Sequence, residues 1–510
     1  MSARHGVPLR GLMSSKTSPH FEGYFGRMFR TLPPASFGAN EVESRKNLAE
    51  LARLMVADPE PDPGKDGPDA EESGIPSLYT YLGQFIDHDL TFDPASSLQK
   101  QNDPDALVDF RTPAFDLDNV YGRGPDDQPY LYDGDTGKFL LGGPIGGGPA
   151  PAFDLPRNGA FPARALIGDP RNDENAIVSQ LQGLFHRFHN RLVDENPILS
   201  FADAQRLVRF HYQYVVVNDF LPRIIHSTVL AELRDDGRYD KGRLAYYKYR
   251  NMPFMPVEFS AAAYRLGHSM VRPGYRLNDG VRLPIFPVAG FPEGLTGFRA
   301  MNPAWGIDWG RFIDIDTRPT GTVDAAGVPD ADALQRLQFA YRLDTSAVDP
   351  LGNLPPSVAS NPASLPLRNL LRGWRLGLPS GQSVAKKMKV TPLCDDEILL
   401  GKFTDPEGTG DEAPKPITDA GAVFAGNCPL WTYIMAETRQ YKELTTLPVT
   451  GEPTLHTPRL GPVGGRIVAE VFLGILFGDP HSFLSQEPDW VPAAGADYQL
   501  KDFVRYALGM

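Results

Sequence analysis

Eight segments of the chain repeat apolar residues every three or four positions, and this helical periodicity is the strongest constraint on its fold. Strand-like alternation of apolar and polar residues is scarce by comparison. The 50 glycines and 49 prolines concentrate between the periodic segments, where they favour turns and loops. We therefore expect a mainly α-helical protein with long irregular loops and very little β structure. The expected helices are 43–56, 77–90, 176–193, 204–225, 259–270, 365–375, 430–444 and 466–477.

The size of the chain predicts one large domain or two closely fused ones. Its 510 residues, of which 41% are hydrophobic, are enough to bury a large core, and no internal repeat divides them. We expect an N-terminal arm over residues 1–40 and a single large domain over residues 41–510. The net charge of -13 disfavours nucleic acid or an anionic membrane as a partner, so a small-molecule substrate is the expected one.

Cysteine usage and hydropathy narrow the class of protein further. Cys394 and Cys428 are far apart in the sequence, which indicates neither a disulfide framework nor a structural zinc site. No apolar run reaches the length of a membrane-spanning helix, so no membrane span is expected. The N-terminus lacks an apolar secretory segment, which makes the cytoplasm the expected location and leaves export by another route open.

The stretch YLGQFIDHDLTF, residues 81–92, places polar side chains in an apolar helix. On a helix, Gln84, Asp87 and His88 fall within an arc of roughly 100°. Burying an acid and an imidazole without partners costs several kcal/mol, so this face should meet a cofactor, a metal or matching polar groups. A hydrogen-bonded core histidine beside an exposed acid is the simpler alternative. A His-Asp pair is also typical of metal-dependent phosphohydrolases, but we find no second cluster of ligands at a suitable spacing.

A second stretch, RTPAFDLDNVYG (residues 111–122), alternates potential oxygen ligands. Thr112, Ala114, Asp116 and Asp118 could direct a hydroxyl, a backbone carbonyl and two carboxylates at one hard cation, the environment that calcium favours. Asp89 could add a ligand from the preceding helix. The alternative is an ordinary solvated acidic turn.

The segment GDPRNDENAIVSQLQGLFHRFHNRL, residues 168–192, begins with charged residues and continues as an amphipathic helix. Arg171 and Glu174 come just before the apolar stripe and form its most notable pair. His186 and His189 lie beside the stripe at a spacing that could bind a metal. Histidines at such positions are more often hydrogen-bonded structural residues.

Two further segments offer an imidazole and an amide. His268, in FSAAAYRLGHSMVRP (residues 259–273), follows small residues and Gly267, which would let a bulky planar group approach closely. A neutral imidazole is a common axial ligand of haem iron. Asn369 lies on the apolar segment 365–375, where an amide oxygen could accept the other N–H of a ligating histidine.

Taken together, these five segments resemble the animal-type haem peroxidases of the peroxidase-cyclooxygenase superfamily, and more closely their shorter bacterial members. GQFIDHDLTF (residues 83–92) is similar to the distal-histidine motif of that family. CPLWTYIMAE (residues 428–437) and RLGPVGGRIVAEVFLGIL (residues 459–476) are similar to the bacterial branch. The resemblance implies the helical fold of that family, haem b and calcium as cofactors, and reduction of hydrogen peroxide.

The resemblance also implies roles for individual residues. His88 would be the distal acid-base, with Gln84 as its neighbour in the pocket and Arg171 as the distal arginine. Asp87 and Glu174 would be the carboxylates esterified to the haem methyls.

The remaining implied roles concern the two metals. His268 would be the proximal ligand of the haem iron, with Asn369 on its far nitrogen. The implied calcium ligands are Asp89, Thr112, the carbonyl of Ala114, Asp116 and Asp118.

One difference from the leukocyte relatives narrows the range of expected reducing substrates. Where the halide-oxidising leukocyte branch has a methionine, this chain has Asn175, so a third, sulfonium link to haem cannot form. We therefore expect small organic donors, iodide, bromide or thiocyanate, rather than chloride, as the reducing substrates.

Two alternatives from the same superfamily remain. Fatty-acid dioxygenases carry a tyrosine three residues before the proximal histidine; here that position is Arg265, and Tyr264 lies one place too early. A non-catalytic haem-containing interaction module has no physical need for His88, Arg171 and His268 together.

Overall fold

The computed structural model describes residues 25–60, 68–91, 113–249, 252–324, 328–359, 361–404 and 413–510. Within these ranges the protein is mainly helical, as the periodicity predicts. The longer helices are α1 (Glu41–Leu54), α2 (Leu78–Leu90), α4 (Ala176–Glu195), α5 (Phe201–Val215), α11 (Leu365–Arg375), α13 (Leu430–Glu437), α14 (Pro462–Gly478) and α16 (Leu500–Leu508). The shorter helices are α3 (Asp118–Tyr121), α6 (Leu221–Ile224), α7 (Ser227–Glu232), α8 (Val257–Ser260), α9 (Gly267–Met270), α10 (Asp349–Gly352), α12 (Gly381–Lys387) and α15 (Phe483–Gln486).

The β structure is limited to small two-stranded sheets, which confirms the second part of the fold prediction. One pair is parallel, β1 (Phe25–Gly26) with β7 (Met255–Pro256). The antiparallel pairs are β2 (Glu72–Pro76) with β10 (Phe339–Tyr341), β3 (Pro144–Ile145) with β4 (Ala152–Phe153), β5 (Arg234–Asp235) with β6 (Arg238–Tyr239), β8 (Gly274–Arg276) with β9 (Arg282–Pro284), β11 (Leu399–Leu400) with β12 (Lys415–Pro416), and β13 (Lys442–Thr446) with β14 (Thr454–Pro458).

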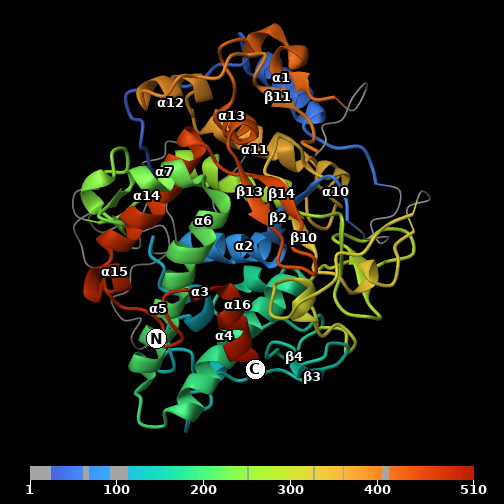
Figure 1. The fold of residues 1–510 in the computed structure, drawn as a ribbon, viewed down its shortest axis with the longest axis vertical. Coiled ribbons are helices and arrows are strands. Elements are labelled where there is room, and N and C mark those ends of the chain that lie inside the picture. The colour runs from blue at the N-terminus through green and yellow to red at the C-terminus, as the bar shows by residue number, and fades with distance from the viewer. Residues whose placement is uncertain are drawn as a thin grey trace.

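Helix α2 lies in the middle of the molecule, with α4, α5 and α16 on one side of it and α1, α11, α12 and α13 on the other (Figure 1). Leu82, Phe85 and Ile86 of α2 are fully buried. Phe85 stacks on Phe185 of α4, with ring centroids 4.4 Å apart. This burial stabilises α2 by roughly 1.5–3 kcal/mol for each large apolar side chain.

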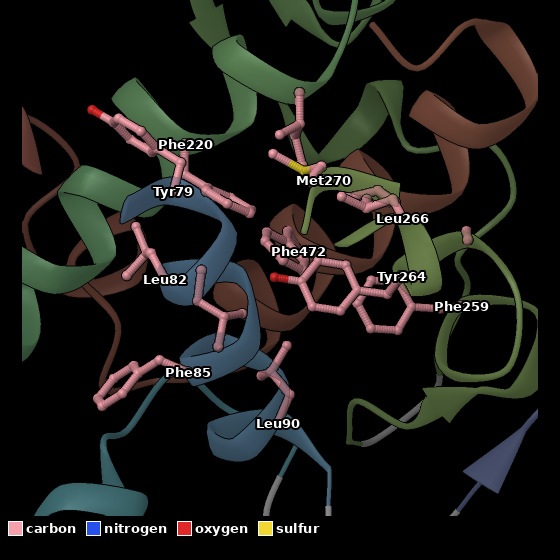
Figure 2. Close-up of a cluster of buried hydrophobic side chains, with 14 of the residues drawn as sticks. Tyr79, Leu82, Phe85, Leu90, Phe220, Phe259, Tyr264, Leu266, Met270 and Phe472 are labelled. Atoms are coloured by element: carbon pink, nitrogen blue, oxygen red, sulfur yellow. The ribbon is translucent and has the colours of Figure 1, made fainter. Parts of the chain in front are cut away.

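A second apolar group faces α2 from the segment that carries His268. Figure 2 shows Phe259, Tyr264 and Leu266 gathered with Phe472 of α14, and the Tyr264 hydroxyl directed toward α2. The rings of Phe259 and Tyr264 stack with centroids 4.7 Å apart, and the Tyr264 hydroxyl donates to the carbonyl of Gly83 at 3.2 Å. The core therefore joins α2 directly to the residues around His268.

Three predicted helices differ in the structure. The segment 259–270 is not one helix but α8, a 3₁₀ turn η6 (Ala263–Leu266) and α9, because Ala262 leaves the helical region at φ -137° and ψ -75°. The segment 430–444 stops being α-helical at Glu437 and continues into β13, because residues 442–446 pair with β14.

The third is 204–225. It begins earlier, at Phe201, because the Ser200 side chain accepts from the backbone N–H of Asp203. It then passes through a π-helical turn, η4 (Val216–Phe220), before α6. Pro222 in α6 has no N–H for the carbonyl of Asn218, and the hydrogen-bond ladder shifts there.

The described part of the expected N-terminal arm packs against the rest of the molecule. Phe25, Phe29 and Phe37 are buried, and β1 pairs with β7. Residues 1–24 lie outside the described part, so the division at residue 40 stays a prediction. Every helix of the described residues is too short or too polar to cross a membrane.

Candidate functional site

Helix α2 carries the first group of predicted site residues. Most of its length is buried, but Gly83, Gln84 and Asp87 keep partly accessible surface on one side, and His88 next to them is buried. These positions follow the helical spacing of three and four residues, so they share one face. The prediction that Gln84, Asp87 and His88 lie on a common side of the helix agrees with this arrangement.

His88 is oriented by an amide. Its Nδ1 lies 2.7 Å from Oδ1 of Asn172, and Nδ2 of Asn172 donates to Oε1 of Gln182 at 2.8 Å. Because Oδ1 of Asn172 can only accept, Nδ1 of His88 carries the hydrogen. In the tautomer with one hydrogen, Nε2 on the other side of the ring is bare.

Nε2 of His88 faces Glu174, with 3.6 Å between this nitrogen and Oε1. Nε2 of Gln84 donates to the same Glu174 oxygen. Asn175 completes the group: its Nδ2 donates to Oε1 of Gln84 at 3.2 Å, while its Oδ1 accepts from the N–H groups of Ile177 and Val178 and caps α4. The start of α4 is thus tied to the polar face of α2.

Arg171 lies in the 3₁₀ turn η3 (Pro170–Asp173), just before α4. Its Nη2 donates to the buried Asp169 at 2.8 Å and to the carbonyls of His88 at 3.0 Å and Thr91 at 2.6 Å. The guanidinium is therefore fixed against the C-terminal end of α2, immediately beside His88. Its side chain is 23% exposed, so the charge is not sealed in the core.

His268 lies in α9, which packs against α2. Burial, together with the charge of Arg265, lowers the pKa of His268 to about 3. The ring is therefore neutral at physiological pH, the state in which an imidazole binds a metal. Nδ1 of His268 lies 2.8 Å from Nδ2 of Asn369, so the predicted pair of residues is in contact.

The amide of Asn369 has the opposite orientation from the one that the sequence analysis expects. Its nitrogen, not its oxygen, is the atom next to Nδ1 of His268. In this orientation the hydrogen of the neutral imidazole is on Nε2. A 180° turn of the amide exchanges its two atoms and gives the acceptor that a metal-ligating histidine requires.

The residues of α2 and α9 have the chemistry to hold a haem. Gly83, Gln84 and Asp87 of α2, like Gly267 and His268 of α9, keep accessible surface although both helices lie in the interior. A Cβ added at Gly267 would meet no atom within 4 Å, so space is open beside His268. This combination of a neutral imidazole, open space and a polar helix face suits an iron porphyrin.

A carboxylate cluster lies on the other side of α2. Asp89 is fully buried, and one of its carboxylate oxygens lies within 4.8 Å of one oxygen of Asp116 and one of Asp118. Leu117, between the two loop acids, is held in a left-handed conformation at φ 60° by its complete burial. Three carboxylates so close repel one another, and a divalent cation would relieve that repulsion. Ala114 is buried in the same loop; the predicted ligand Thr112 lies outside the described residues.

His186 and His189 do not share a metal site with other described residues. Nε2 of His186 lies 2.9 Å from Nε2 of Gln182, and its ring stacks on Phe139. Nδ1 of His189 lies 3.1 Å from the hydroxyl of Tyr121. This arrangement is the hydrogen-bonded alternative that the sequence analysis kept for both histidines.

Asn172, Asp169 and Gln182 were not predicted as site residues. Each is buried and contacts a predicted site residue or its partner. Asp169 and Asn172 flank Arg171 in the sequence, and polar residues on both sides of a predicted site arginine were an available signal. Gln182 had no such signal, because its role depends on the packing of α4 against η3.

Comparison with known proteins agrees with these features. The family model described as animal haem peroxidase matches residues 96–286. A peroxidase-like protein of Margaritifera margaritifera is 29% identical over 166 residues, which is 30% of this chain and 20% of that protein. Chorion peroxidase of Drosophila melanogaster is 35% identical over 112 residues (20% of this chain, 14% of that protein). Thyroid peroxidase of Sus scrofa is 27% identical over 193 residues (33% and 20%). The matches thus span a fifth or less of the length of these relatives.

Two solved structures share the fold along nearly the whole chain. Peroxidase A from Dictyostelium discoideum has a TM-score of 0.58 at 15% identity, covering 95% of this chain and 93% of that one. Fatty acid alpha-dioxygenase from Arabidopsis thaliana has a TM-score of 0.56 at 15% identity, covering 97% and 78%. At this identity the likeness concerns the fold alone. Haem is the cofactor expected throughout this family. The family model, the peroxidase relatives and this fold agree, and the chain is similar to the animal haem peroxidase family over the matched residues 96–286.

Proposed function

We propose that this protein is a haem peroxidase that reduces hydrogen peroxide and oxidises small organic donors, iodide, bromide or thiocyanate. The observation that carries the proposal is that two histidines on adjacent helices, α2 and α9, have different environments. His88 has a hydrogen-bonded Nδ1–H and a bare Nε2, whereas His268 on the adjacent α9 is a neutral imidazole. His88 can move a proton, and His268 can hold a metal.

When bound, haem supplies the iron that coordinates the peroxide and the oxidising equivalents that pass to the donor. Nε2 of His88 would take a proton from one oxygen of the peroxide and return it to the oxygen that leaves as water. His268 would hold the iron through Nε2, with Asn369 on its Nδ1. Gln84 would hold peroxide or water beside His88.

Arg171 would stabilise the negative charge that develops on the leaving oxygen. Its contacts with Asp169 and with the carbonyls of His88 and Thr91 support this role, because they fix the guanidinium before the reaction begins. A donor that does not have to reorganise stabilises developing charge more effectively than mobile water does.

Asp87 and Glu174 would form ester links to the haem methyls. Both are partly accessible, as groups that react with a bound cofactor must be, and Glu174 is 34% exposed. Esterification would also remove the charge of Glu174 from the neighbourhood of Nε2 of His88. Asn175 has an amide where a third, sulfonium link would need a thioether, so chloride oxidation is not part of the proposal.

Calcium is the cation proposed for the carboxylate cluster. Asp89, Asp116 and Asp118 would provide charged ligands, and Thr112 and the carbonyl of Ala114 would complete the shell. Since Asp89 follows His88 directly, the ion would hold the end of α2 in place. We further assign the chain to the bacterial branch of the family, on the segments 428–437 and 459–476.

The test is oxidation of a phenol and of iodide by the haem-loaded protein with hydrogen peroxide. The His88→Gln variant should lose about 10²- to 10⁴-fold in the peroxide-dependent rate, the usual contribution of a general acid-base. His481→Gln, which changes an exposed histidine, should retain the wild-type rate.

Haem-loaded wild-type protein that oxidises neither donor would overturn the proposal. Oxygen uptake with a polyunsaturated fatty acid in the absence of peroxide would instead identify a dioxygenase.

A further inference from the structure

Behind His88 lies a line of buried polar side chains that the proposed reaction does not yet use. It runs from Nδ1 of His88 to Oδ1 of Asn172 (2.7 Å), from Nδ2 of Asn172 to Oε1 of Gln182 (2.8 Å), and from Nε2 of Gln182 to Nε2 of His186 (2.9 Å). None of the four residues is more than 5% exposed. The line begins in α2, passes through η3 and ends in the middle of α4.

The hydrogen bonds along this line can all point in only one of two directions, because each amide has one donor atom and one acceptor atom. In the direction that the structure has, His88 donates from Nδ1 and His186 accepts at Nε2. In the reverse direction both amides turn, Nδ1 of His88 becomes bare, and Nε2 carries the hydrogen. A mixed arrangement would place two donors or two acceptors together, at a cost of about 1–3 kcal/mol for each unsatisfied buried group.

The far end of the line is His186, whose ring has a fixed orientation. The ring of His186 stacks on Phe139, with centroids 4.3 Å apart and planes 4° from parallel, so its orientation is fixed. Burial and the nearby His189 lower the pKa of His186 to about 3. The ring is therefore neutral at physiological pH. When it accepts from Gln182 at Nε2, its own hydrogen is on Nδ1, which has no hydrogen-bond partner among the described residues.

We propose that Asn172, Gln182 and His186 are positioning residues that hold the hydrogen of His88 on Nδ1 and leave Nε2 bare. The proposal rests on the proposed peroxidase function, in which Nε2 must accept the proton of the peroxide. A reversed line would put a hydrogen on that nitrogen and block the first proton transfer. As His88 takes up the proton, Asn172 Oδ1 remains a hydrogen-bond acceptor for Nδ1–H and stabilises the charged ring.

Three variants separate this role from packing. Gln182→Met keeps the shape of the side chain but removes both of its hydrogen bonds. Gln182→Glu keeps an acceptor for Nδ2 of Asn172, and so keeps Oδ1 of Asn172 turned toward His88. Gln180→Met is the matched control, because Gln180 is a buried glutamine on the same helix whose amide bonds Trp305 and Ile307 instead.

The first measurement is the rate of the haem absorbance change on mixing with hydrogen peroxide, per bound haem. Gln182→Met should slow this rate about tenfold or more, since a displaced or mis-protonated base loses much of its contribution. Gln182→Glu should stay within about threefold of wild type, and Gln180→Met should match wild type. An unchanged Gln182→Met rate, or equal losses in both methionine variants, would overturn the proposal.

The second measurement reads the tautomer directly and does not depend on turnover. In the diamagnetic ferrous carbon monoxide complex labelled with ¹⁵N-histidine, the His88 signals are assigned by their loss in His88→Gln. The wild type should carry the hydrogen on Nδ1, and Gln182→Met should show a mixture of tautomers. Wild-type His88 with its hydrogen on Nε2 would refute the proposal even if peroxidase activity is present. Absent activity with Nδ1–H intact would count against the proposed function alone.

Discussion

At the scale of single residues, the site depends on two histidines whose environments suit opposite tasks. Nδ1 of His88 meets an acceptor, Oδ1 of Asn172, and its Nε2 faces Glu174. Desolvation of His268 and the positive charge of the nearby Arg265 keep its ring neutral. Desolvation and a like charge both act against the imidazolium form, so metal binding does not have to compete with a proton at neutral pH.

The first residue-scale prediction concerns covalent haem attachment. After turnover with peroxide, extraction with acidified organic solvent should leave the haem mass on the wild-type chain. Asp87→Val and Glu174→Gln should each remove one link, and the double variant should release all of its haem. Mass spectrometry of the extracted protein measures this, with Asp135→Asn, at an exposed loop acid, as the control. Free haem from the wild type would show that the ester links are not made.

Individual residues differ in how far the sequence could predict them. The contact between His268 and Asn369 was predicted, because an amide on an apolar helix is unusual enough to notice. The partner of His88 was not predicted, because Asn172 lies 84 residues away and only the packing of η3 against α2 brings the two together. The orientation of the Asn369 amide depends on a hydrogen-bond network that no local pattern encodes.

At the scale of elements, α2 links the two proposed cofactor sites. One side of it carries Gln84, Asp87 and His88, and Asp89 on another side meets the loop before α3. The position of the distal base therefore depends on how firmly that loop holds the end of the helix.

Removal of calcium tests this dependence. Calcium should stabilise the protein by about 3 kcal/mol when its concentration is roughly a hundred times the dissociation constant. A chelator should therefore lower the melting temperature and slow the reaction with peroxide, and Asp116→Asn should weaken both responses. Differential scanning calorimetry and stopped-flow absorbance measure these effects, with Asp135→Asn as the control in a nearby exposed loop. A melting temperature that does not respond to calcium would contradict the assignment of this site.

Helix boundaries were predictable where local signals decide them. Helix α11 begins and ends where the periodicity predicts, because Ser364 caps its start with a hydrogen bond to the N–H of Leu367. The break in the segment 259–270 was not predictable, because the helical conformation is interrupted at Ala262 without a glycine or proline to mark that position. Stacking of Phe259 on Tyr264 and their packing on Phe472 accompany this break, and such tertiary contacts override local propensity.

At the scale of the whole molecule, the chain builds its site from segments that are far apart in the sequence. Residues 83–89, 169–175, 268 and 369 meet around α2, which lies at the centre of the helical body (Figure 1). The fold class followed from periodicity and from the scarcity of strand patterns. The packing of the helices around α2 could not be predicted from these patterns, because interior contacts of this kind join residues across most of the chain.

The most direct test of a haem held between α2 and α9 is the absorption spectrum of the haem-loaded protein when its proximal ligand is changed. Wild-type protein should show the spectrum of a histidine-ligated ferric haem. His268→Gly should lose that spectrum, and added imidazole should restore it by occupying the space beside Gly267 and the new glycine. A His268→Gly spectrum identical to that of the wild type would contradict the account.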